Sequence, residues 1–272
     1  MTPGGQEEWP DLDELAELAY RDRRRHLERQ APARTLADTW KDLKREARAL
    51  LLRPAVRQAQ REYEAQRFKR HNERPVEFAF TFKAIGACAP RTILDVGTGL
   101  TALPHLMRNC GPVVTAIDNV TDYWPKGMVN RHWHVLDDDI RRPTLAGSFD
   151  MVTCISTLEH IDPAIVAVQS MLDRLVPGGH LVLTCPYTER SYVPNVYALP
   201  GSRGHSNPYP AQSFSRADVS GWLEGQAAIV SQEYWRYWTG EHWTEGAATI
   251  PPTAAEAQDP HQLTCLLIRK RD

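Results

Sequence analysis

The spacing of hydrophobic residues changes near position 90 of the 272-residue chain. Before that point, apolar side chains recur every three or four residues, which is the period of an amphipathic helix. This pattern predicts helices over 35–54, 55–69 and 75–89, with Pro54 separating the first two. Beyond Arg91, short apolar runs alternate with helix-like stretches, as they do in βαβ units. The sequence therefore predicts a helical extension over 1–74 followed by an α/β domain over 75–272.

Seven strands are expected in the α/β part, and helices such as Ala164–Val176 and Ser215–Leu223 lie between or after them. The last two strands are predicted to form an antiparallel edge on a parallel sheet. A stretch over about 186–214 is rich in tyrosine, proline and glycine, and it is too long for an ordinary connection. It is either a functional lid or a disordered loop. The predicted strands are Thr92–Val96, Val113–Ile117, Trp133–Leu136, Asp150–Ile155, His180–Cys185, Ala228–Trp238 and Leu263–Lys270.

Composition places the chain among ordinary globular proteins, since 42% of its residues are hydrophobic and 24% are charged. The sequence contains no apolar run long enough to span a bilayer, and its first residues are acidic rather than basic and apolar. We therefore expect a cytoplasmic protein without a membrane partner. The five cysteines are widely spaced and include no CxxC pair, which predicts neither a disulfide framework nor a zinc site.

Charge is distributed unevenly along the chain. Residues 1–74 carry 17 Lys and Arg against 14 Asp and Glu, a net of +3, and the remaining 15 bases and 20 acids give −5. A basic helical segment can bind nucleic acid. Acids such as Asp42 and Glu46 are interleaved with the bases, however, as they are on a solvated helix face. Nucleic acid is therefore an unlikely partner, although a nucleic-acid-binding protein stays an alternative.

The motif ILDVGTG at 93–99 joins a predicted strand to a glycine turn. The series Gly97, Gly99 and Ala102 satisfies a dinucleotide-binding pattern, and Asp118 follows 118 − 97 = 21 residues later, where a ribose-binding acid is expected. A pyrophosphate at this turn would be repelled by the carboxylate of Asp95, whereas a cationic ligand would be attracted. An NAD-dependent oxidoreductase is thus the less favoured of two interpretations.

Five motifs of the chain resemble, in order, the motif set of the class I S-adenosylmethionine-dependent methyltransferases. They are ILDVGTG (93–99), TAIDN (115–119), LDDDI (136–140), FDMVTCISTLEHI (149–161) and LVPGGHLVLTCP (175–186). The resemblance implies a Rossmann-like, doubly wound and mostly parallel sheet of seven strands, with Leu263–Lys270 as its antiparallel member. It also implies S-adenosyl-L-methionine as the cofactor. The acid pair and amide that hold magnesium in some members have no counterpart that we can assign, so we expect no metal.

The same resemblance assigns cofactor-binding roles. Asp95, Gly97 and Gly99 would cradle the methionine part, and Asp118 would bind the ribose. An acid from the run 137–139 would read the amino edge of adenine together with the backbone of Ile140. The register of this run is ambiguous. The resemblance favours Asp139, because its ten-residue spacing to Phe149 is similar to the family's, and Asp138 is the alternative.

The segment after the fourth predicted strand carries Glu159 and His160. It resembles the version found in members that act on small molecules, and it differs from the Asn-Pro-Pro-Tyr version of nucleic-acid methylases. The acceptor is therefore expected to be a small molecule, a glycan or a natural product, methylated at oxygen. His160 is either the general base for a hydroxyl or a structural helix cap. Glu159, Tyr187 and His205 are further candidates for acceptor contacts, and the sequence does not indicate an oligomeric state.

Overall fold

The computed structural model describes residues 17, 21, 36–68, 71–124 and 126–272, in two compact units that span Met1–Lys69 and Arg70–Asp272. The first unit contains helix α2 (Leu36–Glu64), which continues through Pro54. The predicted break at Pro54 is therefore wrong. A proline removes one helical hydrogen bond, and the strong helix formers that surround it keep the helix intact. The helix start expected at Thr35 lies outside the described residues.

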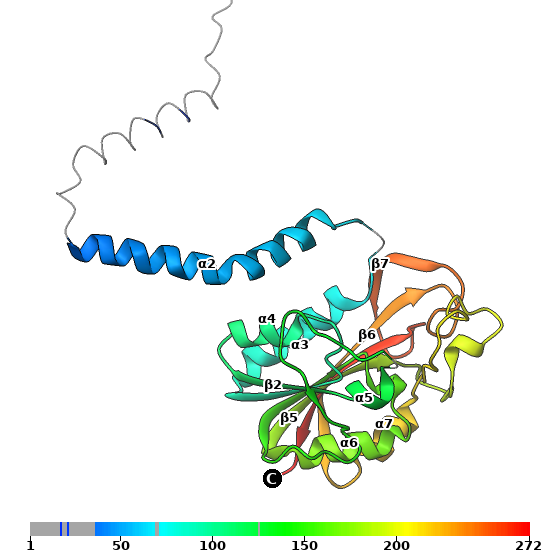
Figure 1. The fold of residues 1–272 in the computed structure, drawn as a ribbon. Coiled ribbons are helices and arrows are strands. Elements are labelled where there is room, and N and C mark those ends of the chain that lie inside the picture. The colour runs from blue at the N-terminus through cyan, green and yellow to red at the C-terminus, as the bar shows by residue number, and fades with distance from the viewer. Residues whose placement is uncertain (1–16, 18–20, 22–35, 69–70, 125) are drawn as a thin grey trace, which may run out of the picture. The chain divides into compact units, whose positions relative to one another are not determined.

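The second unit is built on one sheet, to which eight strands contribute in the described part of the chain (Figure 1). Its order is β3-β2-β1-β4-β5-β8-β6-β7, and β1 to β5 run parallel where they are paired. The strands are β1 (Thr92–Val96), β2 (Val113–Asp118), β3 (Leu136–Asp137), β4 (Phe149–Ile155), β5 (Leu175–Pro186), β6 (Ala227–Trp238), β7 (Ala248–Ala255) and β8 (Leu263–Lys270).

Helices cover both faces of this sheet, because side chains alternate along each strand. On one face, Ile93 and Val182 pack with α3 (Arg74–Cys88) and α4 (Leu103–Asn109). On the other face, Leu94 and Leu183 pack with α6 (Ala164–Asp173) and α7 (Arg216–Leu223). Figure 1 shows the two helix layers on opposite sides of the strands. The doubly wound α/β architecture expected from the sequence is confirmed.

The predicted antiparallel pairing of the last two expected strands is confirmed, because β6 pairs antiparallel with β8, but these strands do not form the edge of the sheet. Strand β8 pairs antiparallel with both β5 and β6, so it lies inside the sheet rather than at its edge. The edge position is taken by β7, a strand that the sequence did not predict. Its Pro251 and Pro252 argue against a central strand, but an edge strand tolerates proline because one side of its backbone needs no partner. In the part of the chain that the structure describes, the sheet therefore has eight strands instead of seven.

The boundaries of two other strands also differ. Strand β3 is only Leu136–Asp137, two residues long and shifted from the predicted Trp133–Leu136. Strand β5 begins at Leu175 and includes Pro177, whereas the sequence predicts a helix up to Val176 and a strand only from His180. Its partner β4 shifts register between Phe149 and Met151, so this irregular start of β5 is accommodated beside a bulge.

The order in which successive strands are added to the sheet reverses at β1, which lies between β2 and β4. Strands β2 and β3 extend the sheet to one side, and β4 returns to the other side of β1. In open parallel sheets, ligands bind beyond the carboxyl ends of the strands at such a switch point. The ends of β1, β2 and β4 are therefore where a functional site is expected.

The long loop between β5 and α7 (residues 187–214) is packed rather than disordered. Val196 and Ser213 are fully buried, and the backbone N–H of Val193 donates to the carbonyl of Ser213 at 2.9 Å. The N–H of Gln212 donates to the carbonyl of Glu159 at 2.9 Å, which attaches the loop to the segment after β4. In the described part of the chain, no helix combines the length and apolar character needed to cross a membrane.

Candidate active site

A cavity of about 560 Å³ lies at the switch point of the sheet. This volume falls in the range of small-molecule and cofactor sites. The ends of β1, β2 and β4 form its floor, and α3 and the long loop contribute walls. The residues that it shares with the predicted site are Asp95, Gly97, Gly99, Asp118, Asp138, Asp139, Ile140 and His160.

The glycine turn after β1 needs residues without side chains. Gly97 has a φ of +72°, and a Cβ atom there would lie 2.0 Å from Cγ2 of Thr157. The Thr157 hydroxyl donates to the Gly97 carbonyl at 3.0 Å, so the turn is fixed against the segment that follows β4. Gly99 also has a positive φ, of +55°. Its N–H donates to Oδ2 of Asp118 at 2.7 Å, which ties the turn to the end of β2.

Asp95 is the buried acid at the end of β1, with 2% of its surface exposed. Its two carboxylate oxygens accept hydrogen bonds from the hydroxyls of Thr98, at 2.7 Å, and Thr153, at 2.6 Å. Burial raises the pKa of Asp95 to about 6, and these two donors oppose the increase. Near neutral pH this acid carries a negative charge. Because the buried carboxylate is poorly solvated, a cation placed beside it would stabilise the charged form strongly.

Asp118 ends β2 and accepts two hydrogen bonds from within the site. Besides Gly99, the indole N–H of Trp124 donates to its Oδ1 at 3.0 Å. Trp124 follows helix α5 (Val120–Tyr123) and lines the cavity. Each carboxylate oxygen can accept more than one hydrogen bond, so Asp118 keeps capacity for hydroxyl donors of a ligand. No local pattern singles out Trp124, since only the folded chain brings its ring to Asp118.

The acids after β3 have different partners. The carboxylate of Asp138 accepts from the N–H groups of Thr144 and Leu145, both at 2.9 Å, and so closes the turn that follows. Asp139 forms an ion pair with Arg141 at 2.8 Å. The hydrogen bond from Arg141 lowers the pKa of Asp139. Both aspartates reach the cavity, and Ile140, which follows Asp139, is buried.

His160 stands opposite the glycine turn, in the short 3₁₀ helix η1 (Leu158–His160). Its Nδ1 lies 2.8 Å from the carbonyl oxygen of Pro210 in the long loop. A carbonyl only accepts hydrogen bonds, so Nδ1 carries the proton in this contact, and Nε2 of the neutral ring keeps its lone pair. Burial lowers the pKa of His160. The ring is thus a neutral proton acceptor near pH 7, with Tyr209 packed edge-on at 4.8 Å between centroids.

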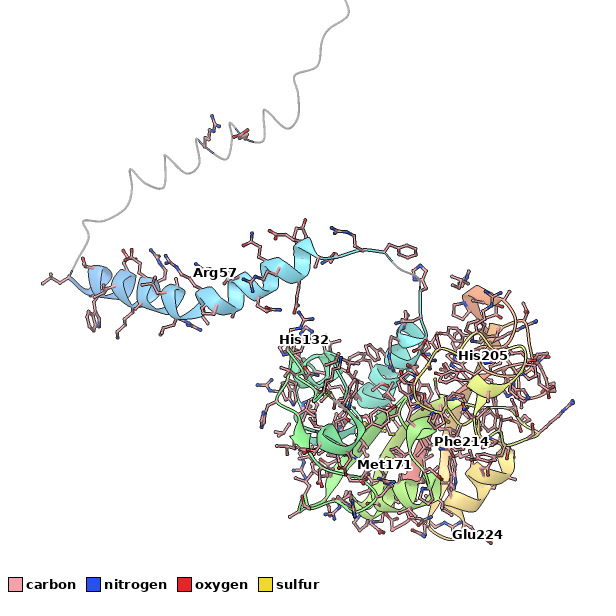
Figure 2. The ribbon with its side chains drawn as sticks, turned by 45° about the vertical axis from the view of Figure 1, so that its right-hand side comes forward. Arg57, His132, Met171, His205, Phe214 and Glu224 are labelled. Carbon is pink, nitrogen blue, oxygen red and sulfur yellow. The ribbon has the colours of Figure 1, made fainter. Side chains whose placement is uncertain are left out.

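The other three predicted acceptor residues do not line this cavity in the described part of the chain. Glu159 is 5% exposed, and its Oε2 has no hydrogen-bond partner among the described residues. Burial raises the pKa of Glu159 to about 8. Tyr187 is fully buried and stacks on His261 at 5.7 Å, so it belongs to the core beneath the loop. His205 lies exposed on the long loop (Figure 2).

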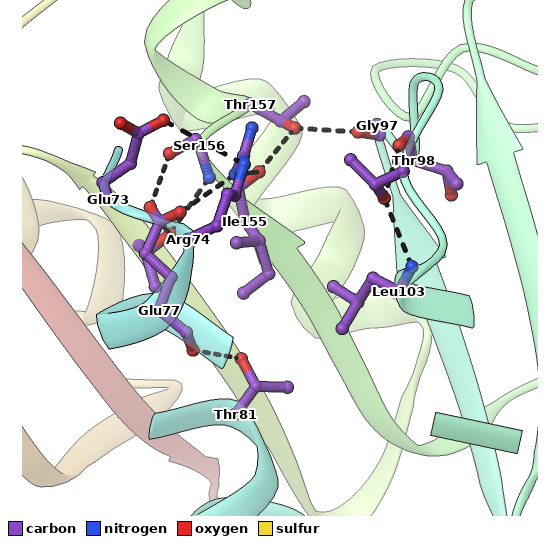
Figure 3. Close-up of polar contacts among 12 residues, drawn as sticks. Glu73, Arg74, Glu77, Thr81, Gly97, Thr98, Leu103, Ile155, Ser156 and Thr157 are labelled. Atoms are coloured by element: carbon purple, nitrogen blue, oxygen red, sulfur yellow. Dashed lines mark hydrogen bonds and ion pairs between the residues drawn. The ribbon is translucent and has the colours of Figure 1, made fainter. Parts of the chain in front are cut away.

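Helix α3 supplies a cavity residue that the sequence analysis did not single out. Arg74 begins this helix and lines the cavity, and its Nη1 donates to Oε2 of Glu77 at 2.9 Å. Figure 3 shows this pair beside the end of β4. In the sequence, this ion pair is indicated by the three-residue spacing of Arg74 and Glu77, which favours an ion pair on one helix face.

The charges around the cavity favour a ligand with positive groups. Among the described lining residues, six are aspartates and two are arginines. One of the arginines, Arg141, is already paired with Asp139. S-adenosylmethionine carries an ammonium and a sulfonium and no phosphate, so the donor set and the cavity volume fit it. Among the described residues, no cluster of three or more His, Cys, Asp or Glu side chains is arranged to hold a metal ion.

Comparisons with known proteins agree with this fold. A family model described as a methyltransferase domain matches residues 23–217. Ubiquinone biosynthesis O-methyltransferase from Psychrobacter arcticus is 36% identical over 106 residues, which are 35% of this chain and 41% of the relative. The enzyme of the same name from Haemophilus ducreyi is 28% identical over 125 residues, or 42% of this chain and 53% of the relative. The chain thus spans about half or less of the length of these relatives.

A solved structure has the same architecture. Burkholderia thailandensis 1,6-didemethyltoxoflavin-N1-methyltransferase, with 1,6-didemethyltoxoflavin and S-adenosylhomocysteine bound, has a TM-score of 0.51 at 12% identity. The alignment covers 89% of this chain and 93% of that chain, and it shows a shared fold. The family match covers more than half of the chain and includes the motifs that form the cavity. The chain therefore belongs to the methyltransferase-domain family, within the class I S-adenosylmethionine-dependent methyltransferases.

Proposed function

We propose that this protein transfers the methyl group of S-adenosylmethionine to a hydroxyl oxygen of a small-molecule acceptor, with His160 as the general base. One observation carries the proposal: His160 lines the same cavity as the glycine turn and Asp118, and its Nδ1 contact with Pro210 leaves Nε2 unprotonated. The name of the relatives, ubiquinone biosynthesis O-methyltransferase, supports oxygen as the methylated atom.

In this proposal, the ends of β1 and β2 bind the cofactor. Asp95 and the Gly97–Gly99 turn hold the methionine part, and Asp118 accepts hydrogen bonds from the ribose hydroxyls. Asp139 and the backbone of Ile140 read the adenine amino edge, with Asp138 as the alternative. The contacts of Asp138 with two backbone N–H groups support Asp139, because they give Asp138 a structural task in the turn.

Arg74 binds the α-carboxylate of the cofactor. Charge supports this assignment. The amino-acid end of the cofactor carries one anionic group, and among the described residues the cavity offers only two arginines against six aspartates to bind it. Geometry supports it as well. Glu77 and the carbonyl of Ile155 contact Nη1 of Arg74, and Glu73 lies 4.0 Å from Nε, so Nη2 is left for a ligand in the described part of the site.

The reaction asks the chain mainly to position two molecules. The cofactor supplies a methyl group on a sulfonium, which is open to in-line attack. Holding the acceptor oxygen against that methyl is worth up to about 7 to 11 kcal/mol. Removal of the hydroxyl proton by a placed base contributes a further factor of about 10² to 10⁴. His160 suits this task because its ring is fixed by Pro210 on one side and Tyr209 on the other.

The acceptor is held on the side of His160 that faces the long loop. Glu159 precedes His160 and keeps an unpartnered oxygen among the described residues, but its buried carboxyl is absent from the described lining of the cavity, so it is assigned no contact with the acceptor. We further propose that residues 1–74 act as a helical cap on the acceptor site of the domain at 75–272. The exposed apolar side chains of α2, among them Leu36 and Leu51, support this proposal, because exposed apolar patches commonly mark binding surfaces.

Calorimetry with S-adenosylhomocysteine and with NAD tests the cofactor assignment first. We expect binding of S-adenosylhomocysteine and none of NAD, and the opposite result would refute the proposal in favour of an oxidoreductase. A second step incubates the protein with radiolabelled S-adenosylmethionine and a panel of small phenols and alcohols. Label transferred to oxygen supports the proposal, and label found only on nitrogen or carbon contradicts it.

A further inference from the structure

Glu77 is a fully buried carboxylate in the first turn of α3. Its side chain contacts three different elements of the fold. Arg74 donates to Oε2, and the hydroxyls of Ser156 and Thr184 both donate to Oε1, the latter at 2.7 Å. These hydroxyls lie 79 and 107 residues away in sequence. A buried acid with partners this distant joins α3 to the ends of β4 and β5.

The contact from Ser156 depends on an unusual backbone. Ser156 follows β4 directly and has a φ of +45°, in the left-handed region that residues other than glycine seldom adopt. Its N–H donates to Oγ1 of Thr184 at 3.0 Å, and its hydroxyl donates to Glu77. Strained conformations of this kind persist where surrounding contacts hold them, and they concentrate at functional sites.

The next residue connects this network to the glycine turn. Thr157 donates to the carbonyl of Gly97 and occupies the space where a Gly97 side chain would be. Figure 3 shows the series of contacts that runs from Arg74 through Glu77 and Ser156 toward Gly97. The guanidinium and the glycine turn, which stand on opposite sides of the proposed methionine site, are thereby held at a fixed separation.

We infer that Glu77 is a positioning residue, which orients Arg74 toward the α-carboxylate of the cofactor and fixes its distance from the glycine turn. This inference rests on the proposed function. The acid is needed because a charge-assisted hydrogen bond is about twice as strong as a neutral one and holds the planar guanidinium in one orientation. Burial raises the pKa of Glu77, and Arg74 and the two hydroxyl donors oppose that increase.

The test compares two ligands that differ in one end. S-adenosylhomocysteine contains the amino acid, whereas 5′-methylthioadenosine has the same adenosine and thioether without it. In Glu77→Gln, which keeps the size of the side chain, we expect calorimetry to show about tenfold weaker binding of S-adenosylhomocysteine and unchanged binding of 5′-methylthioadenosine. In an Arg74→Met background, adding Glu77→Gln should have no further effect on either ligand, because the two residues act as one unit.

Glu73→Gln is the matched control, since Glu73 is a neighbouring acid that lies 4.0 Å from Arg74 and shares none of the hydroxyl donors. It should change neither affinity by more than about twofold. Equal weakening of both ligands by Glu77→Gln would reduce Glu77 to a structural residue and overturn the inference. So would unchanged affinity for S-adenosylhomocysteine.

Thr184→Val provides a second route if Glu77→Gln does not fold. It removes one donor to Glu77 and keeps the charge pair, so we expect a weaker effect in the same direction, about threefold and confined to S-adenosylhomocysteine. An equal loss for both ligands contradicts the inference here as well. A parent protein that binds neither ligand would instead refute the proposed function, and the two failures are therefore distinguishable.

Discussion

The two sides of the cavity are held together in different ways. On the cofactor side, Asp118 bonds to Gly99 and Trp124, which are 19 and 6 residues away, and Asp138 bonds to Thr144, 6 residues away, although Thr157 also bonds to Gly97 across 60. On the acceptor side, His160 contacts Pro210 across 50 residues, and Gln212 contacts Ile161 across 51. Local contacts form wherever the motif is present, whereas distant contacts need the complete fold.

This difference indicates how the two sides divide the work. The cofactor side is a set of acids on strand ends, each within a short motif, and the sheet brings these motifs together. The acceptor side is assembled from η1 and the long loop, which are free to vary without disturbing the sheet. Changes on the first side should therefore alter cofactor affinity, and changes on the second should alter turnover.

The largest effect is expected for His160→Gln. The substituted side chain keeps a hydrogen bond donor for Pro210 but cannot take a proton, so kcat at saturating substrates should fall by about 10² to 10⁴-fold. Because burial lowers the pKa of His160, the acidic limb of the parent's pH profile should lie below the ordinary histidine value of 6.5, and it should disappear in the variant. His105→Gln, at an exposed histidine, is the control. A loss of less than tenfold with the limb retained would make His160 structural.

Removal of residues 1–69 should impair the acceptor side and leave the cofactor side unchanged. The second compact unit begins at Arg70, so the shortened chain keeps the sheet and the cavity. If the N-terminal helices cap the acceptor, turnover should fall by about 10²-fold, the effect of a misplaced reactant. Calorimetry should still detect S-adenosylhomocysteine with roughly its original affinity. Turnover equal to that of the full chain would reject the cap.

Asp118→Ala should affect only the cofactor side. Loss of the hydrogen bonds between a carboxylate and two ribose hydroxyls costs about 1.5 to 3 kcal/mol, so the affinity for S-adenosylhomocysteine should fall about 10 to 150-fold. Asp173→Ala removes an exposed aspartate and serves as the control for net charge. Equal affinities of Asp118→Ala and the parent in calorimetry would show that the ribose is held elsewhere.

The smallest effect is a change of stability on the acceptor side. Burial raises the pKa of Glu159 to about 8 from an ordinary value of 4.5. Between these values the unfolded chain releases the proton while the folded protein retains it, so the contribution of Glu159 to stability is lost as pH rises. At pH 8, the free energy of unfolding of Glu159→Gln, measured with denaturant, should exceed that of the parent by about 1 kcal/mol or more.

The advantage of Glu159→Gln should vanish below about pH 4.5, where the parent carboxyl is protonated in both states. Glu224→Gln, at an exposed glutamate, should show no such trend. The difference in unfolding free energy between Glu159→Gln and the parent is followed across this pH range. A constant difference would indicate that Glu159 is solvated, contrary to its burial.

The sequence predicted strands most accurately where they are buried on both faces. Strands β1 and β8 match the predicted ranges, because apolar runs of that length leave few alternatives. The edge strands β3 and β7 were misplaced or missed. An edge strand is stabilised by a single neighbour, so its own residues carry little of the signal, and in β7 the two prolines mask it.

The sequence by itself determined the doubly wound sheet, the glycine turn and the acids that follow β1, β2 and β3, because each depends on a short segment whose periodicity and turn residues are local. Only the tertiary structure decided which of these groups meet. It brought Arg74 to the cavity, joined Glu77 to Thr184, set Nδ1 of His160 against Pro210, and placed Tyr187 in the core. These outcomes depend on hydrogen bonds and packing between residues 50 or more apart, and no local pattern encodes such distances.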